Sequence, residues 1–140
     1  MRVYVDSSAL LKRVFAEDES RALNAALTKY VRVDAALVTS SLAWVEVTRA
    51  VRAHAAAAGA PVDVDELADI ALSGVLEKPV SAEVIALARR LGPPVLRSLD
   101  ALHLATALLV DANVLVAYDL RLLAATAEHG IPALSPGVKG

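Results

Sequence analysis

The chain lacks cysteine, long hydrophobic runs and an excess of positive charge, and each absence excludes a class of protein. Without cysteine it forms neither disulfides nor thiolate metal sites. No uninterrupted apolar run approaches the roughly eighteen residues that a membrane-spanning helix needs. The polar residue Asp6 stands where a signal peptide would carry its apolar segment, so we expect a cytoplasmic protein without a membrane partner.

The charge balance also limits the partners. The formal net charge is −2, whereas proteins that bind nucleic acid non-specifically are usually basic. Any contact with nucleic acid would therefore be local, through a few arginines and a metal ion. Only three histidines are present and they lie far apart, so carboxylates are the expected metal ligands. Oxygen ligands favour magnesium or manganese over zinc.

What the chain does contain is a regular alternation of short apolar runs and longer helical patterns. A length of 140 residues suits one domain, and a composition that is 56% hydrophobic supports a sizeable core. We expect strands at residues 2–5, 36–40, 75–80, 114–118 and 131–134, and helices at 8–15, 19–31, 40–58, 63–72, 81–91, 98–111 and 119–130. This alternation predicts an α/β fold with a short central parallel sheet flanked by helices on both faces.

Two aspartates follow predicted strands directly. Asp6 comes after the strand at 2–5, and Asp119 comes after the strand at 114–118. In parallel sheets the carboxyl ends of the strands share one edge, which is where active sites lie. Both acids are therefore expected at the same edge of the sheet. Asp6 has an ordinary alternative role as a helix cap.

Two further acids lie on predicted helices and also have ordinary alternatives. Glu46 lies in the middle of the helix at 40–58, where it would either pair with Arg49 or face a site. Asp100 lies in the first turn of the helix at 98–111, after Ser98 as the expected cap, where an acid complements the helix dipole. Taken singly, none of these acids requires a function.

Taken together, the acids match a family pattern. The stretches VYVDSSALLK, SSLAWVEVTRA, SLDALHLATA and VLVAYDLRLLAAT, the last followed by HGI, resemble in order and spacing the four acidic motifs of the PIN domain, most closely those of VapC-type toxins. The resemblance runs from Met1 to about Pro136 and implies a single PIN domain over residues 1–140. The matching acids are Asp6, Glu46, Asp100 and Asp119, and the family's position for Asp119 is the more variable one.

The resemblance implies an activity and a set of partners. In that family the matching acids bind a divalent cation, Mg²⁺ with Mn²⁺ as a substitute, and cut RNA. The chain would then be the toxin of a type II toxin–antitoxin system, an endoribonuclease that inhibits translation by cleaving tRNA, rRNA or mRNA. Its expected partners are a VapB-type antitoxin and a second copy of itself in a homodimer.

Elementary electrostatics supports a cation at such a site. Two carboxylates about 5 Å apart repel each other by roughly 3 kcal/mol at an effective dielectric constant near 20. Several converging acids therefore need protons or a cation to coexist at neutral pH. A divalent metal ion supplies that charge and suits phosphodiester hydrolysis.

Other residues near the motifs are candidates for lesser roles. Substrate binding is expected for a hydroxyl and three cations next to the acids, namely Ser7, Lys12, Arg13 and Arg97. His103 lies one turn after Asp100 and is interpreted as a packed or supporting residue rather than a base. Trp44 is interpreted as a core or interface residue.

Three alternatives compete with a metal-dependent nuclease. A haloacid-dehalogenase-type phosphatase needs a second aspartate two residues after the first, where this chain has Ser8. A response-regulator receiver needs an acidic pair after the first strand, and only Asp6 is present there. A catalytically inactive PIN-fold module that binds RNA or protein would have lost one or more of the four acids, and all four are present.

Overall fold

The computed structural model of the protein describes residues 1–139, which form five strands and seven helices. The strands are β1 (Arg2–Val5), β2 (Ala36–Ser40), β3 (Val75–Lys78), β4 (Val114–Val116) and β5 (Ala133–Leu134). The helices are α1 (Ser7–Leu11), α2 (Ser20–Arg32), α3 (Leu42–Ala58), α4 (Val64–Ala71), α5 (Ala82–Ala88), α6 (Ser98–Leu109) and α7 (Leu120–Glu128). One or two helices separate each strand from the next, as the sequence predicts.

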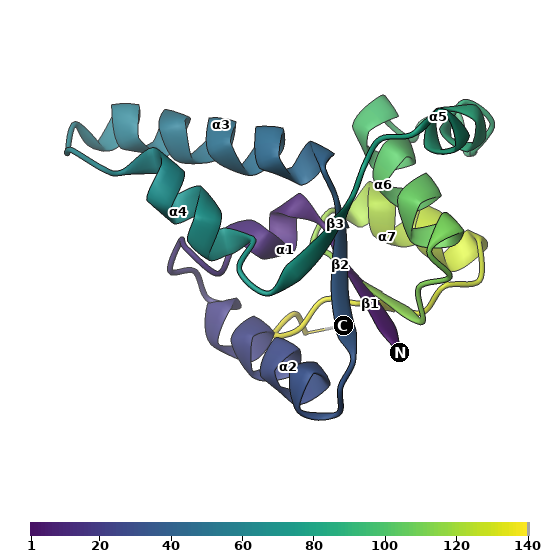
Figure 1. Ribbon diagram of the computed structural model, residues 1–140, viewed down its shortest axis with the longest axis horizontal. Coiled ribbons are helices and arrows are strands. Elements are labelled where there is room, and N and C mark those ends of the chain that lie inside the picture. The colour runs from purple at the N-terminus through teal and green to yellow at the C-terminus, as the bar shows by residue number, and fades with distance from the viewer. Residues whose placement is uncertain (140) are drawn as a thin grey trace.

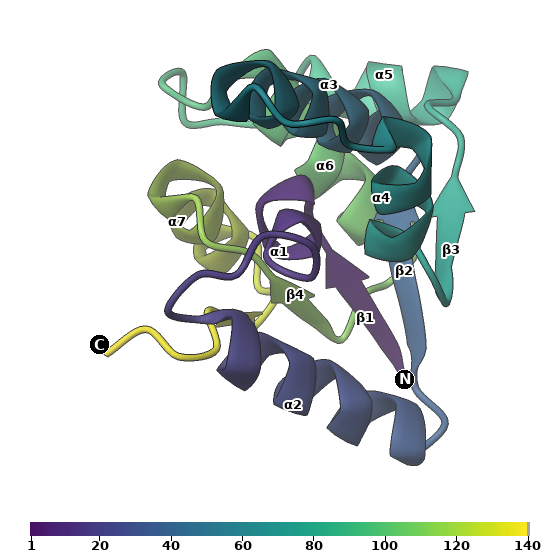
Figure 2. The same ribbon diagram turned by 90° about the vertical axis from the view of Figure 1, so that its left-hand side faces the viewer.

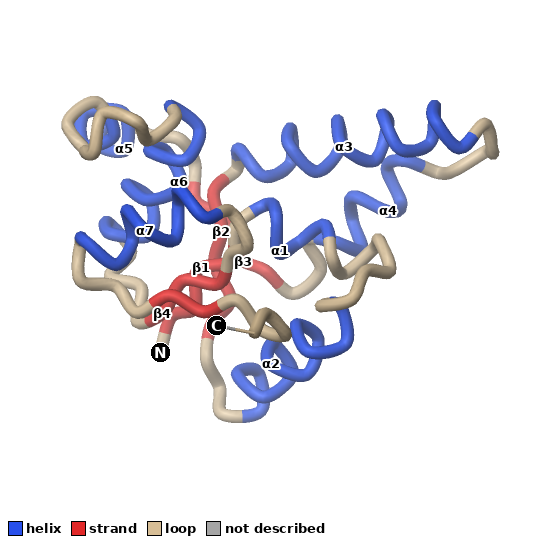
Figure 3. Tube along the Cα trace, turned by 180° about the vertical axis from the view of Figure 1, so that it is seen from behind, coloured by secondary structure: helices blue, strands red, loops and turns tan. Residues whose placement is uncertain are grey.

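All five strands are parallel and form one sheet in the order β3-β2-β1-β4-β5. In Figure 3, β1 to β4 lie together between the helices. The central strand, β1, places Tyr4 opposite Val38 of β2 and opposite Leu115 of β4. The chain fills one side of β1 with β2 and β3 and then the other side with β4 and β5. The strand order therefore reverses between β1 and β4, and open parallel sheets bind ligands outside the carboxyl ends of the strands at such a reversal.

Helices cover both faces of the sheet, which confirms the predicted α/β class. In Figure 1, α1 to α4 lie to the left of the sheet and α5 to α7 to the right. Successive side chains of a strand point to opposite faces, so β1 supplies both cores. Val3 and Val5 are buried among residues of α1 to α4, and Tyr4 is buried among residues of α6 and α7.

Two helices, α1 and α5, are shorter than expected, and a third, α6, begins with a different cap. α1 ends at Leu11 instead of near residue 15, and α5 ends at Ala88 instead of near residue 91. The prediction that Ser98 caps α6 is wrong, because Arg97 is the cap and Ser98 already occupies the first helical position. The other elements agree with the expected bounds to within two residues. Throughout residues 1–139, no helix combines the length and the apolar character needed to cross a bilayer.

Candidate active site

The parallel strands bring Asp6, Glu46, Asp100 and Asp119, which we call the acidic cluster, to one end of the molecule. Asp6 follows β1 and Asp119 follows β4, the two strands between which the order reverses. Glu46 lies in the second turn of α3 and Asp100 in the first turn of α6. In Figure 2, α1 continues from the arrowhead of β1, and α3 and α6 lie beyond that end of the sheet. Burial, and then the charges of Asp119 and Glu46, raise the pKa of Asp100.

Asp6 is buried and caps α1. Its Oδ1 accepts hydrogen bonds from the backbone N–H of Ala9 at 3.0 Å and from the hydroxyl of Ser8 at 2.6 Å. Burial raises the pKa of Asp6 to about 6, although both hydrogen bonds favour the ionised carboxylate. Within residues 1–139, Oδ2 accepts no hydrogen bond. Asp6 therefore caps α1 through Oδ1, and its Oδ2 is available to bind a cation.

Asp119 is exposed and caps α7 in the same way. Its Oδ1 accepts hydrogen bonds from the backbone N–H groups of Arg121 at 2.9 Å and Leu122 at 3.0 Å. Asp100 is half-buried, and its charge complements the positive end of the α6 dipole. Helix capping and membership of the acidic cluster are therefore compatible roles, since the cap uses only one carboxylate oxygen.

Glu46 is held by two side chains from other elements. Its Oε1 accepts hydrogen bonds from the hydroxyl of Ser7 at 2.7 Å and from Nε2 of His103 at 2.5 Å. Burial acts to raise the pKa of Glu46, but the hydrogen bonds from His103 and Ser7 outweigh it and lower the pKa. In the described chain Glu46 forms its ion pair with His103 and not with Arg49, the partner that helical spacing suggested.

His103 lies between Glu46 and the core. Its Nδ1 is 2.7 Å from the hydroxyl of Tyr4, and its ring is buried. Burial acts to lower the pKa of His103, but the hydrogen bond with Glu46 and the charges of Asp6 and Asp100 reverse this and raise the pKa. The structure agrees with a supporting role for His103. The sequence does not single out Tyr4, because its place in a buried strand marks only a core residue.

Ser7 and Arg97, two of the predicted substrate-binding residues, lie beside the acidic cluster. The Ser7 hydroxyl is directed at Glu46. Arg97 is exposed, and its charge acts to lower the pKa of Asp100 against the larger effect of burial. RNA binding by Ser7 and Arg97 stays a prediction.

Lys12 and Arg13, the other two predicted substrate-binding residues, are engaged elsewhere. The Nζ of Lys12 lies 2.8 Å from a carboxylate oxygen of Glu17 and 3.1 Å from one of Glu19. The guanidinium of Arg13 donates to two carbonyls at the C-terminal end of α4, each at 2.8 Å. Both cations connect segments of the fold. RNA binding by Lys12 and Arg13 stays a prediction.

The acidic cluster offers a divalent cation oxygen ligands only, the donor type that Mg²⁺ and Mn²⁺ favour. As they stand, no three His, Asp or Glu side chains in residues 1–139 are arranged to hold a metal ion. Glu46 contributes to this, because its Oε1 faces His103 and Ser7. The residues thus fit a cation through the chemistry of their donor atoms and not through a preformed arrangement. Metal binding stays a prediction.

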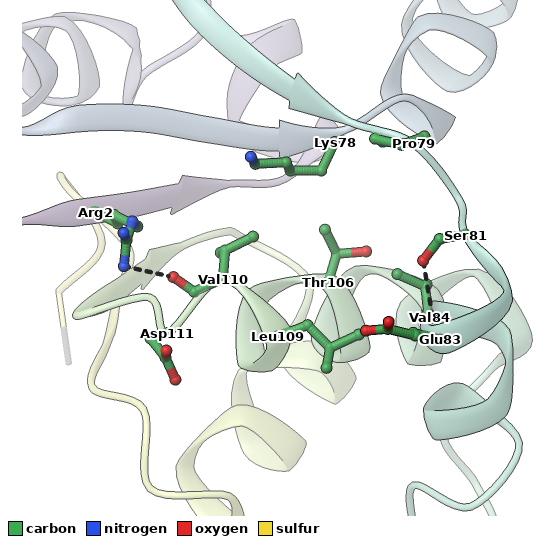
Figure 4. A pocket seen from close by; sticks show the side chains of 10 residues that line it. All are labelled: Arg2, Lys78, Pro79, Ser81, Glu83, Val84, Thr106, Leu109, Val110 and Asp111. Carbon is green, nitrogen blue, oxygen red and sulfur yellow. Dashed lines mark hydrogen bonds between the residues drawn. The ribbon is translucent and has the colours of Figure 1, made fainter.

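The cavity drawn in Figure 4 lies apart from the acidic cluster. It has a volume of about 340 Å³ and is lined by residues of β3, α5 and the C-terminal half of α6. Its cations, Arg2 and Lys78, are offset by the carboxylates of Glu83 and Asp111. Arg2 also donates to the carbonyl of Val110 at 3.2 Å. The balanced charge of this cavity indicates no particular ligand.

Comparison with known sequences gives consistent matches over almost the whole chain. The family model described as PIN domain matches residues 3–128. Ribonuclease VapC47 of Mycobacterium tuberculosis (strain CDC 1551 / Oshkosh) is 39% identical over 137 residues, which cover 96% of this chain and 97% of that protein. Ribonuclease VapC46 of Mycobacterium tuberculosis (strain ATCC 25618 / H37Rv) is 37% identical over 141 residues, with the same coverage.

Solved structures share the fold at much lower sequence identity. The crystal structure of Mycobacterium tuberculosis VapC20, described as a sarcin-ricin loop cleaving toxin, has a TM-score of 0.71 and 15% identity and covers 96% of this chain and 99% of its own. VapBC2 from Rickettsia felis, bound to a DNA fragment from its promoter, has a TM-score of 0.70 and 14% identity and covers 96% of this chain and 98% of its own. At these identities the likeness establishes the fold alone.

Proposed function

The chain belongs to the PIN domain family, and from this membership we propose that it is the toxin of a type II toxin–antitoxin system. It is a VapC-type endoribonuclease that hydrolyses RNA phosphodiester bonds and thereby inhibits translation. The observation that carries this proposal is that Asp6 and Asp119 follow the two strands at the reversal in strand order. Glu46 and Asp100 lie near enough for the charge of Glu46 to act on Asp6 and Asp100, and for that of Asp119 to act on Asp100. We further propose that residues 1–140 are one PIN domain and that the protein acts in the cytoplasm on tRNA, rRNA or mRNA.

We propose that the activity depends on Mg²⁺ or Mn²⁺, with Asp6, Glu46, Asp100 and Asp119 as the residues that hold the ion. When bound, such an ion polarises a phosphate oxygen and lowers the pKa of the attacking water. Two features support this assignment: the mutual repulsion of the carboxylates, and the burial that raises the pKa of Asp6 to about 6. Both costs fall when the carboxylates share a positive charge.

The chain's own residues provide orientation around these carboxylates. Asp6 is fixed through Oδ1 by Ser8 and the start of α1, and Glu46 is fixed through Oε1 by Ser7 and His103. Each of these two acids therefore presents one oxygen in a defined direction. The exposed guanidinium of Arg97, beside Asp100, is suited to hold the RNA backbone, since phosphate contacts position a nucleic acid.

The alternative, a catalytically inactive PIN-fold module that binds RNA or protein, is not favoured. Such a module has no use for four acids held at one end of the sheet. The burial of Asp6 also lowers the stability of the fold, because its ionised carboxylate loses hydration. A role in cation binding accounts for a carboxylate at such a position. A helix cap alone is provided at least as well by Asn or Ser.

A VapB-type antitoxin is the proposed protein partner. Exposed apolar side chains adjoin three of the four acids in sequence, namely Val45, Leu99 and Leu120, which are 56%, 48% and 80% exposed. An antitoxin segment that carries an Arg beside apolar side chains would match both the charge and the apolar surface. Exposed apolar side chains of this kind also support the proposal that the chain forms a homodimer.

Controlled expression tests the proposed function. The wild type should arrest growth and create new RNA 5′ ends, whereas Asp6→Ala and Asp100→Asn should do neither. Co-expression of the proposed VapB-type antitoxin should restore growth, and the antitoxin should purify with the toxin. Asp65→Asn, an exposed acid of α4, is the matched control and should arrest growth like the wild type. Growth arrest that survives loss of Asp6, without new RNA ends, would favour the inactive binding module.

A further inference from the structure

A cavity between α2 and the turn that joins α4 to β3 is distinct from the cavity drawn in Figure 4. It has a volume of about 400 Å³, and we call it the α2 cavity. In Figure 1, α2 lies below α4 and this turn. Asn24, Thr28 and Arg32 line the α2 cavity from one face of α2, because residues four apart in sequence share a face of a helix. Arg13 and Ser73 line it as well.

The charge at the α2 cavity is positive. The described residues that line it include the guanidinium groups of Arg13 and Arg32 and no carboxylate. Across residues 1–139, neither of these arginines forms an ion pair. In the cavity of Figure 4, by contrast, two carboxylates offset the two cations. Two cations that line one cavity without a counter-charge favour an anion as its ligand.

Arg13 presents its guanidinium in a fixed orientation. Its Nη1 donates hydrogen bonds to the carbonyls of Ala71 and Ser73, each at 2.8 Å. A guanidinium carries five N–H groups, and in the described chain those of Nη2 and Nε bond no protein acceptor. The side chain is half-buried, and this burial lowers the pKa of Arg13. An anion in the α2 cavity would compensate the guanidinium for the hydration that it has lost.

The other residues of the α2 cavity favour a phosphate ester over a simple carboxylate. The hydroxyls of Thr28 and Ser73 and the amide of Asn24 can donate hydrogen bonds in addition to those of the guanidinium groups. A phosphate monoester has three terminal oxygens to accept them, whereas a carboxylate has two. Leu27 and Val31 add an apolar surface for the organic part of the ligand. A volume near 400 Å³ lies within the range of roughly 300–1,000 Å³ that is usual for small-molecule sites.

We propose that the α2 cavity binds a small phosphate monoester of nucleotide size, with Arg13 and Arg32 as the residues that contact the phosphate. The site is separate from the acidic cluster. Its lining includes Leu37, near the start of β2, and Gly74, which precedes β3, whereas the acidic cluster lies beyond the carboxyl ends of the strands. This inference does not depend on the proposed function. RNA, the ligand that the sequence predicts for Arg13, is the competing ligand.

Isothermal titration calorimetry of the full chain with AMP tests the inference, in a phosphate-free buffer without divalent cations. One AMP should bind per chain, and adenosine should not bind because it lacks the phosphate. Inorganic phosphate should bind more weakly than AMP, since it makes no contact with Leu27 and Val31. The affinity for AMP should also fall as the salt concentration rises, because screening weakens the attraction to the exposed guanidinium of Arg32.

Three exposed positions of α2 supply the variants. Arg32→Gln removes one guanidinium and should weaken AMP binding by about tenfold or more. Asn24→Asp places a carboxylate in the α2 cavity and should abolish AMP binding, because that carboxylate competes for the guanidinium groups. Lys29→Gln is the matched control. It removes a charge from the same last turn of α2, outside the α2 cavity, and should leave AMP affinity unchanged. All three variants should unfold in urea close to the wild type.

The possible results separate this inference from the proposed function. No binding of AMP to the wild type would overturn the inference, as would equal AMP affinity in the wild type, Arg32→Gln and Asn24→Asp. A single-stranded RNA without a terminal phosphate that binds where AMP does not, and loses affinity in Arg32→Gln, would overturn it in favour of an RNA contact. Asp100→Asn should bind AMP like the wild type without cleaving RNA. A wild-type chain that binds AMP and cleaves no RNA would overturn the proposed function alone.

Discussion

The hydroxyl of Ser8 donates a hydrogen bond to Oδ1 of Asp6 at 2.6 Å. The same hydroxyl accepts a hydrogen bond from the backbone N–H of Tyr118 at 3.0 Å. Tyr118 immediately precedes Asp119, so one side chain connects the two segments that follow β1 and β4. Ser8 thus links the ends of the two strands that flank the reversal in strand order.

Replacing Ser8 by Ala should therefore affect both stability and the pH dependence of cleavage. The Tyr118 N–H loses its partner, at a cost of about 1–3 kcal/mol. The pKa of Asp6 should rise further, because a hydrogen bond to its ionised form is lost. The rise of cleavage rate with pH should therefore move to higher pH, as measured by initial rates between pH 5 and 9.

Ser81→Ala is the matched control for this variant. Ser81 caps α5 by accepting a hydrogen bond from the N–H of Val84, and it lies outside the acidic cluster. Its loss should cost about 1 kcal/mol of stability without moving the pH profile. If Ser8→Ala shows the same unchanged profile, the hydroxyl does not influence Asp6.

Asp6→Asn should stabilise the metal-free protein at pH 7.5 and have little effect at pH 4. The pKa of Asp6 is raised from its ordinary value of 3.8 to about 6, so the folded state holds this proton more tightly than the unfolded state. Its contribution to stability is full at low pH and is lost as pH rises from about 4 through 6. Asn keeps the Oδ1 cap and avoids that loss, which predicts a gain of about 1–3 kcal/mol at pH 7.5. Urea unfolding in EDTA at pH 7.5 and at pH 4 measures the difference in stability between Asp6→Asn and the wild type. An equal difference at both pH values would contradict the raised pKa of Asp6.

Removal of divalent cations should abolish RNA cleavage, and Mg²⁺ or Mn²⁺ should restore it. A cation that binds only the folded chain also raises the melting temperature, in proportion to the logarithm of its concentration. Asp100→Asn should remove both the cleavage and most of this thermal shift. Cleavage that continues in excess chelator would exclude the metal-dependent mechanism.

Asp111→Asn should stabilise the fold without changing cleavage. Asp111 adopts the left-handed conformation, with φ of 53°, just after α6, where Asn is more favourable and a negative charge opposes the helix dipole. A gain of about 0.5–1 kcal/mol in the free energy of unfolding, measured in urea, is expected from the lost charge repulsion alone.

Gly130→Ala is a control with the opposite expected effect on stability. Gly130 has a φ of 79° and open space around it, so the added methyl group meets no other atom. Gly130→Ala should therefore lower the free energy of unfolding by about 1 kcal/mol through backbone strain alone.

Most of the fold follows from patterns that are local in the sequence. The strands are buried apolar runs, and the stops after α3 and α7 are glycines with positive φ, Gly59 and Gly130. One misplaced boundary, the end of α1, lies beside a contact between distant segments. α1 ends at Leu11, and the Arg13 side chain beyond it reaches across to the end of α4. Such a contact leaves no periodic signal in the sequence.

From the sequence, Asp6 and Asp119 could be assigned to one edge of the sheet because each follows a predicted strand, whereas Glu46 and Asp100 were added by the resemblance to the PIN-domain motifs. The interactions among side chains could not be assigned from the sequence. Helical spacing suggested Arg49 as the partner of Glu46, but the partner is His103, 57 residues away on another helix. Likewise, only the structure shows that Lys12 is paired with Glu17 and Glu19 and does not serve as a free cation.

The pairing of β1 with β4 also sets the order in which the protein becomes active during its synthesis. β1 is translated long before β4, and the two strands meet only after Tyr4 and Leu115 are both available for pairing. A ribosome-bound chain that has not yet reached Asp119 lacks one of the four acids. If all four acids are needed, as we propose, the nuclease therefore stays incomplete until Asp119, at the start of α7, has been translated and β4 has paired with β1.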